Sequence, residues 1–204
     1  MTTTIHLMRH GQVHNPDNIL YGRLSGYFLS DEGIAQTQAA GRWLADKNIS
    51  AIYCSPMERA IQTATIVAEH LGGLSPREDE RIIEVFTPYE GQATAKLAAK
   101  GWDLYTGNEP PYEVPAGVLE RILDFFDDTL RRHRGESVLA VAHGEILVFP
   151  WLHAQGEMPE ALMKDRLLDY ALPVEYPATA SVMTFELDGS PREQRPKVSY
   201  DCPY

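Results

Sequence analysis

Two histidine-glycine pairs are the groups most suited to chemistry in this chain. His10 and Gly11 follow Arg9 at the end of a short apolar run, and His143 and Gly144 end a second apolar run far along the sequence. A neutral imidazole can act as a nucleophile, and a guanidinium has a fixed fork of donors for phosphate oxygens. Glycine lets a ligand approach the backbone closely. The two pairs therefore indicate one shared site for phosphoryl chemistry.

Apolar runs and helical spacing alternate along the chain. Strands are expected at residues 5–8, 51–54, 137–142 and 181–187, with a further extended segment at 81–85. Helices are expected at 30–47, 56–71, 94–99, 119–133 and after residue 143, where Pro150 would disturb the helix. The alternation favours an α/β fold with a mostly parallel central sheet and helices on both faces. We expect one domain over residues 1–204, with a cap-like insertion around 90–135.

The carboxyl ends of parallel strands are where ligands bind in such sheets. His10, Arg59 and His143 each follow the end of an expected strand, so they should meet at one edge. Ser55 and Glu58 have the spacing of a capping box, which predicts a helix starting at Pro56. Arg59 would then lie in the first turn of that helix, where free backbone donors favour an anion.

Composition limits the possible partners. A chain of 204 residues with 44% hydrophobic and 23% charged residues is typical of one globular domain. The net charge of −11 argues against broad binding to nucleic acid or to a membrane, because both would need a basic face. With two distant cysteines and no membrane-spanning apolar run, we expect neither a disulfide framework nor a zinc site, and a cytoplasmic location. A homodimer is compatible with the sequence.

Four segments in order resemble the histidine phosphatase superfamily, also called the phosphoglycerate mutase-like superfamily. They are LMRHG at 7–11, YCSPMERAIQTA at 53–64, the region from Glu84 to Tyr89-Glu90-Gly91, and VAHGE at 141–145. The pair Gly22-Arg23 and LSDEG at 29–33 also resemble the loop into the first helix of that family. These segments span most of the chain.

The resemblance implies a fold of that superfamily and a phosphomonoesterase that forms a phosphohistidine at His10. Glu84 would protonate the leaving alkoxide, and no metal or cofactor is implied. The groups that would hold the phosphoryl oxygens are Arg9, Arg59 and His143. The residues that would contact the small phosphorylated substrate are Gly11, Asn15, Arg23 and Gly144.

Several alternatives stay open at this point. The segment after Glu84 is one residue shorter than usual in the family, so Glu90 or Glu80 could be the acid instead. Val13 and Pro16 replace residues common in the family, which predicts a reshaped first loop. Asn15 could reach the phosphate or form a loop turn. The spacing from Cys54 to Arg59 is one residue too short for a cysteine phosphatase loop.

The type of reaction is also open. A mutase that moves phosphate within a phosphoglycerate is the second hypothesis, ranked lower because no arginine lies between Glu90 and Glu120 to bind a substrate carboxylate. A catalytically weak phosphate-binding regulatory module is the third hypothesis. Residues 92–112, which include Trp102 and Tyr105, would cover the site and select the substrate.

Overall fold

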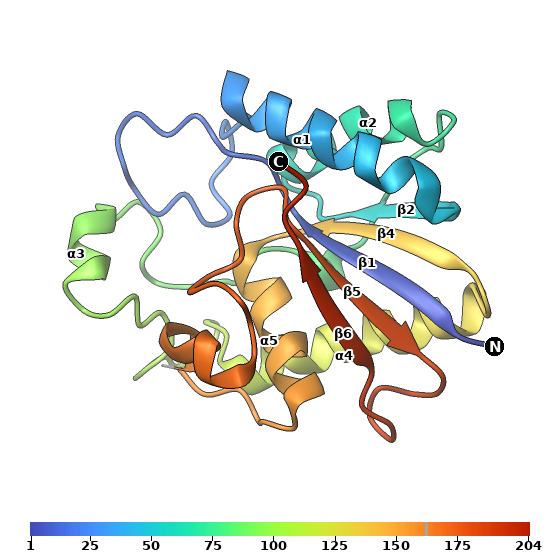
Figure 1. The fold of residues 1–204 in the computed structure, drawn as a ribbon. Coiled ribbons are helices and arrows are strands. Elements are labelled where there is room, and N and C mark those ends of the chain that lie inside the picture. Colours follow the sequence, from blue (N-terminus) through green and yellow to red (C-terminus); the bar gives the residue numbers. More distant parts are fainter. Residues whose placement is uncertain (162) are drawn as a thin grey trace.

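A central sheet organises the computed structural model, which describes residues 1–161 and 163–204 (Figure 1). Within these residues six strands pair in the order β3-β2-β4-β1-β5-β6. Their bounds are β1 Thr3–Arg9, β2 Ile49–Cys54, β3 Arg77–Glu78, β4 Ser137–Ala142, β5 Val182–Leu187 and β6 Lys197–Asp201. The first four strands of that order pair in parallel, and β5 and β6 pair antiparallel. The predicted α/β fold with a mostly parallel sheet is confirmed.

Helices cover both faces of the sheet. The α-helices are α1 Asp31–Leu44, α2 Glu58–His70, α3 Thr94–Ala98, α4 Pro115–Arg132 and α5 Gly144–Gln155, and 3₁₀ turns cover Ala45–Lys47, Glu80–Ile82 and Met163–Tyr170. In Figure 1, α1 and α2 lie on one face of the sheet, and α4 and α5 lie on the other. Leu7 packs toward α4 and α5 and Met8 packs toward α1 and α2. Strands buried on both faces are apolar at successive positions for this reason.

Two local predictions were wrong, and one strand was not predicted. Ser55 does not cap the second helix: α2 begins at Glu58 after Met57, which has no side-chain cap bond. The segment 81–85 contains part of a 3₁₀ turn rather than a strand. The strand that was not predicted is β6 at the sheet edge, because its partly exposed residues have no apolar pattern in the sequence.

The region around 90–135 has two parts. Residues 90–114 contain α3 and irregular loops, and α3 lies beside the loop of residues 11–30 (Figure 1), where Thr94 bonds to the carbonyl of Asn18. In contrast, α4 packs its apolar side, including Phe125 and Phe126, into the core against the sheet. No helix among the described residues is long and apolar enough to cross a membrane.

Candidate active site

The ends of three parallel strands bring the predicted residues together. The register pairs Arg9 of β1 with Ala142 of β4, so His10 and His143 leave neighbouring strands side by side. Their ring centroids are 5.3 Å apart. Arg59, in the first turn of α2, is fully buried between them and bonds to both rings.

The hydrogen bonds of His10 define which ring nitrogen is available. Nδ1 lies 2.7 Å from the carbonyl oxygen of Gly11, which can only accept, so Nδ1 carries the proton. Nε2 therefore has a lone pair, which accepts a hydrogen bond of 3.2 Å from Nε of Arg59. Burial, reinforced by the charges of Arg59 and Arg9, lowers the pKa of His10 well below its ordinary value of 6.5. At neutral pH, His10 is an uncharged imidazole with a usable Nε2.

Two buried guanidinium nitrogens have unused donors. Nη2 of Arg59 donates to the carbonyl of Gly22 at 2.7 Å and to Nδ1 of His143 at 3.1 Å. Nη1 of Arg9 donates to the carbonyl of Pro177 at 2.6 Å. Among the described residues, Nε of Arg9 and Nη1 of Arg59 are the buried side-chain nitrogens or oxygens with no hydrogen-bond partner. Unpaired buried donors are costly, and an oxyanion with several acceptor oxygens is the ligand that fits them.

His143 is oriented from the opposite side by a serine. Because Arg59 can only donate, Nδ1 of His143 accepts, and Nε2 donates to Oγ of Ser55 at 2.7 Å. Burial is the main cause that lowers the pKa of His143 well below 6.5, and the charge of Arg59 adds to it. The sequence did not reveal this role of Ser55, because the same residue also fits a helix cap.

Glu84 is the acidic residue that lies next to His143 and Arg59. Its Oε2 lies 3.6 Å from Nδ1 of His143 and 3.8 Å from Nη2 of Arg59, and its Oε1 accepts from the amide of Val85 at 2.9 Å. Burial raises the pKa of Glu84, and the negative charge of Glu145 raises it further, although the charge of Arg59 opposes both. A carboxyl group with a raised pKa can be protonated at a pH at which an ordinary carboxyl group is ionised.

The other two candidate acids lie elsewhere. Glu80 is exposed, and Oε1 of Glu90 accepts from the backbone amide of Arg23 at 2.6 Å. The Arg23 side chain lies behind Glu84: Nε donates to the Glu84 carbonyl at 2.7 Å and Nη2 donates to Glu113 at 2.9 Å. Arg23 therefore holds the backbone of Glu84, and its guanidinium is not among the groups that line the cavity.

The other three residues predicted to contact the substrate also have structural roles. A side chain at Gly11 would overlap the carbonyl of Gly33 in α1, so this glycine is needed for helix packing. Asn15 lines the cavity, but its side chain bonds both backbone groups of Ile19 at 2.9 and 3.3 Å, which makes it part of the loop turn. Gly144 lines the cavity, and a Cβ there would overlap the hydroxyl of Tyr176.

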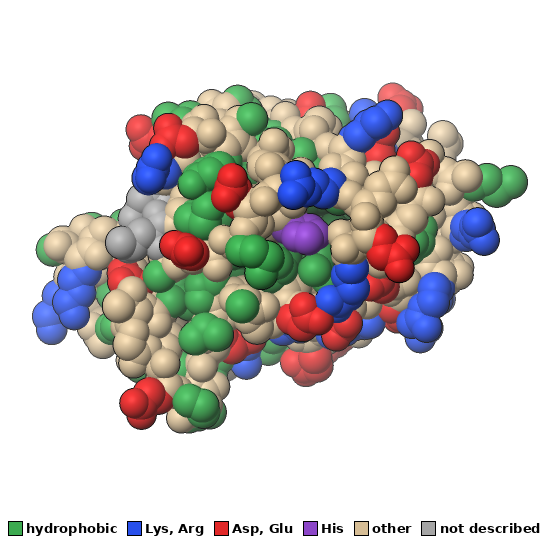
Figure 2. All heavy atoms as spheres, turned by 90° about the horizontal axis from the view of Figure 1, so that it is seen from below, with side chains coloured by type: hydrophobic (Ala, Val, Ile, Leu, Met, Phe, Trp, Pro, Cys, Tyr) green, Lys and Arg blue, Asp and Glu red, His purple; other side chains and the backbone are tan. Residues whose placement is uncertain are grey.

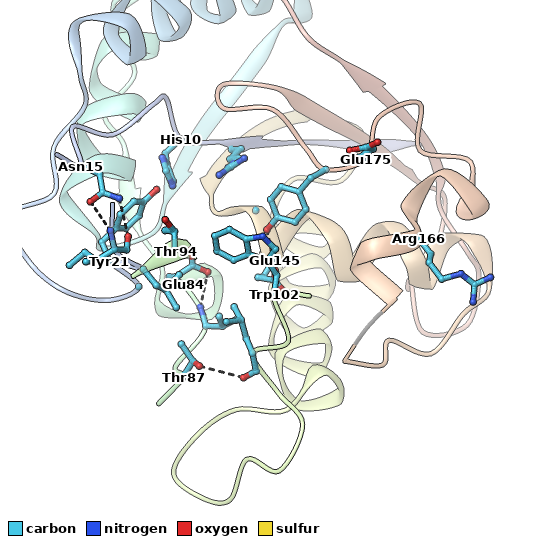
Figure 3. A pocket seen from close by; sticks show the side chains of 18 of the residues that line it. His10, Asn15, Tyr21, Glu84, Thr87, Thr94, Trp102, Glu145, Arg166 and Glu175 are labelled. Carbon is cyan, nitrogen blue, oxygen red and sulfur yellow. Dashed lines mark hydrogen bonds between the residues drawn. The ribbon is translucent and has the colours of Figure 1, made fainter. Parts of the chain in front are cut away.

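A cavity of about 690 Å³ opens next to His10. Figure 3 shows His10, Tyr21 and Glu84 at one end and Arg166 and Glu175 at the other. Its walls also include apolar residues, namely Ile19, Leu20, Val85, Trp102, Leu104 and Leu168. In the view of Figure 2, a histidine side chain is visible in an opening of the surface, with acidic and basic side chains around it. The lining includes Arg9 and His10 but not His143 or Arg59, and it extends as far as Arg166 and Glu175, so there is room for a group attached to a bound phosphate.

An α/β sheet whose strand ends bring together two neutral histidines, the buried Arg59 and the partly buried Arg9 defines a protein class suited to binding a phosphoryl group. The model of the histidine phosphatase superfamily (branch 1) matches residues 5–174, and the chain belongs to this family.

Individual proteins are similar to this one over most of the chain. The chain is 36% identical over 149 residues to the uncharacterized protein Rv0525 of Mycobacterium tuberculosis, covering 69% of this chain and 73% of that one. It is 30% identical to the putative phosphoserine phosphatase 2 of Hydrogenobacter thermophilus, covering 70% and 74%. Among solved structures, YhfR of Bacillus stearothermophilus has a TM-score of 0.76 at 27% identity, covering 98% and 96%.

Proposed function

We propose that this protein is a metal-independent phosphomonoesterase that hydrolyses a small phosphorylated metabolite through a phosphohistidine at His10. The observation that carries the proposal is the lone pair of Nε2 of His10 beside two guanidiniums, each of which has one buried nitrogen with no hydrogen-bond partner. The names of similar proteins, a putative phosphoserine phosphatase among them, support hydrolysis of a phosphomonoester.

In the first step Nε2 of His10 attacks phosphorus, a P–N bond forms, and the P–O bond to the alcohol breaks. Glu84 gives its proton to the departing alkoxide. Arg9 and Arg59 hold the phosphoryl oxygens, and such positioning is the main means of catalysis in phosphoryl transfer. The proton stays on Nδ1 of His10, and its hydrogen bond to the carbonyl of Gly11 keeps the ring in place.

His143 changes its role when substrate binds. The second pKa of a phosphomonoester is about 6, so the substrate can arrive as a monoanion, and the dianion formed beside the ring favours transfer of its proton to Nδ1 of His143 despite the low pKa of the empty site. That nitrogen then donates to a phosphoryl oxygen, while Nε2 keeps its bond to Ser55. In the second step the carboxylate of Glu84 takes a proton from water as the water oxygen attacks phosphorus. The P–N bond breaks, its electrons return to Nε2, and His143 returns its proton to a phosphoryl oxygen, so that inorganic phosphate leaves as the monoanion and both histidines are neutral again.

A panel of phosphorylated metabolites, assayed with wild type and His10→Ala, tests the proposal. We expect His10→Ala to lose activity by more than about 10³-fold, because a nucleophile has no substitute in this mechanism. His14→Ala is the matched control, since His14 is exposed in the following loop. Wild type quenched during turnover should carry acid-labile phosphate that His10→Ala lacks. Activity surviving in His10→Ala would refute the mechanism, and faster transfer to a phosphoglycerate than release of phosphate would favour the mutase.

A further inference from the structure

A buried carboxylate outside the proposed chemistry joins three segments around the cavity. Glu145, the second residue of α5, is 5% exposed and lines the cavity. Its Oε2 accepts a hydrogen bond of 2.7 Å from the hydroxyl of Tyr105, and its Oε1 accepts one of 3.1 Å from the hydroxyl of Tyr176. Tyr105 belongs to the loop that covers the site, and Tyr176 follows the 3₁₀ turn Met163–Tyr170. A carboxylate buried in this way ties those two segments to α5.

Tyr176 in turn contacts a phosphate-binding candidate. The guanidinium carbon of Arg9 lies 5.3 Å from the centroid of the Tyr176 ring, and Nη1 of Arg9 donates to the carbonyl of the next residue, Pro177, at 2.6 Å. One residue thus contacts the face of the guanidinium and its neighbour contacts an edge. Residues 176–177 therefore fix the direction of the remaining Arg9 donors, including the unpaired Nε.

Gly144 is what permits this arrangement. A Cβ at this position would overlap the hydroxyl of Tyr176, so any other residue would displace the ring from its contact with Arg9. The glycine of the second His-Gly pair therefore leaves space for the Tyr176 ring rather than for the substrate.

We propose that Glu145 and Tyr176 are positioning residues for Arg9, and that they connect the roof of the cavity at Tyr105 to its phosphate end. This rests on the proposed function in one respect, namely that Arg9 holds the phosphoryl group. Neither residue needs to touch the substrate. Loss of either should weaken phosphate binding and slow turnover by leaving Arg9 misdirected.

Variants of Tyr176 separate the hydrogen bond from the ring contact. Tyr176→Phe keeps the ring over Arg9 and loses the bond to Glu145, whereas Tyr176→Leu loses both. We expect the Kd of inorganic phosphate, measured by calorimetry, to rise a few-fold in the first and roughly tenfold in the second, with kcat falling in the same order. Tyr53→Phe is the matched control, because the Tyr53 hydroxyl is bonded to Nε2 of His133 at 3.0 Å, and neither residue lines the cavity. Its Kd and kcat should stay within about twofold of wild type.

A double-mutant cycle tests whether Tyr176 acts through Arg9. In an Arg9→Ala background, Tyr176→Leu should cause no further loss of phosphate affinity, because the group that it positions is gone. Additive losses, or Tyr176 variants that match wild type while keeping its unfolding temperature, would overturn the inference. Failure of the proposed function looks different: wild type itself would not bind phosphate, or His10→Ala would stay active. The conservative Tyr176→Phe keeps the test valid if Tyr176→Leu does not fold.

Discussion

Oγ of Ser55 lies 2.7 Å from Nε2 of His143, and this bond joins the residue after β2 to the residue after β4. The two strands are neighbours in the sheet, so the contact follows from their parallel register. Arg59 can only donate, so Nδ1 of His143, which faces Arg59 and Glu84, accepts, and Nε2 donates its hydrogen bond to Oγ of Ser55. The orientation of one histidine ring thus depends on the residue that follows the neighbouring strand.

Removing that hydroxyl should impair the reaction more than the fold. We expect Ser55→Ala to lower kcat by about tenfold, the equivalent of one hydrogen bond of about 1–2 kcal/mol. Ser50→Ala at the other end of β2 is the control, because the exposed Ser50 bonds Glu136 far from the site. Steady-state kinetics and thermal unfolding of both variants check this. Equal kcat in the two variants would contradict the role of Ser55.

Substitution of three glutamates distinguishes the proton donor. Glu84→Gln should lower kcat by about 10²- to 10⁴-fold on an alkyl phosphate, because the alkoxide then leaves without a proton. The loss should be much smaller on p-nitrophenyl phosphate, whose leaving group needs no proton. Glu80→Gln and Glu90→Gln should behave alike on both substrates, since neither carboxylate lines the cavity. A leaving-group effect in Glu90→Gln instead would move the acid to that residue.

The pH dependence of kcat/KM should be bell-shaped. The reaction needs neutral His10 and protonated Glu84, two states that barely overlap at the ordinary pKa values of 6.5 and 4.5. Burial lowers the pKa of His10 and raises that of Glu84, so a range of pH opens in which both states coexist. We expect the midpoint of the acid limb, which His10 causes, to lie below pH 6.5. The midpoint of the basic limb, which Glu84 causes, should lie above pH 4.5. An acid limb at or above pH 6.5 would show that His10 is not held neutral.

His6 should make the fold sensitive to acid. It is 4% exposed and bonds Thr184 through Nδ1 at 2.9 Å; burial, with the charge of Lys47 adding to it, lowers its pKa to about 4. As pH falls, His6 therefore binds a proton near pH 6.5 in the unfolded chain but only near pH 4 in the native state. This contribution to stability is complete above pH 6.5 and is lost as pH falls toward 4, by up to about 3 kcal/mol.

Comparing wild type with His6→Asn measures that contribution. The difference in their free energies of unfolding should change between pH 7 and pH 4, with wild type losing more stability than the variant. Urea titrations at several pH values give both quantities. A difference that stays constant over this range would show that His6 titrates in the native state as it does in the unfolded chain.

The sequence predicted those parts of the site that depend on local pattern. His10, Arg59 and His143 each follow an apolar strand, and parallel strand ends share an edge, so their meeting could be foreseen. Ser55 could not be assigned, because a serine after a strand fits a helix cap as well as a histidine partner. Glu145 and Tyr176 lie 31 residues apart, and nothing in local spacing indicates their hydrogen bond.

Arg23 illustrates a different limit. The resemblance carried its position over to the substrate, but in the fold its guanidinium is bonded to the Glu84 backbone and to Glu113. Which face of a loop an arginine takes depends on the carboxylates that tertiary packing brings near it. The antiparallel β6 was missed for a related reason, since an edge strand needs only one pairing partner and no apolar face.

Arg9 and Arg59 belong to a protein of net charge −11, and this contrast affects how an anionic substrate arrives. At distances beyond the cavity a phosphate dianion meets repulsion, and the attraction of Arg9 and Arg59 acts only once it is inside. Added sodium chloride shortens the range of the repulsion, with a Debye length of about 10 Å at 0.1 M, and barely weakens contacts in a buried site. Capture of substrate should therefore become faster at moderate ionic strength, which kcat/KM measured from about 10 to 150 mM salt will reveal.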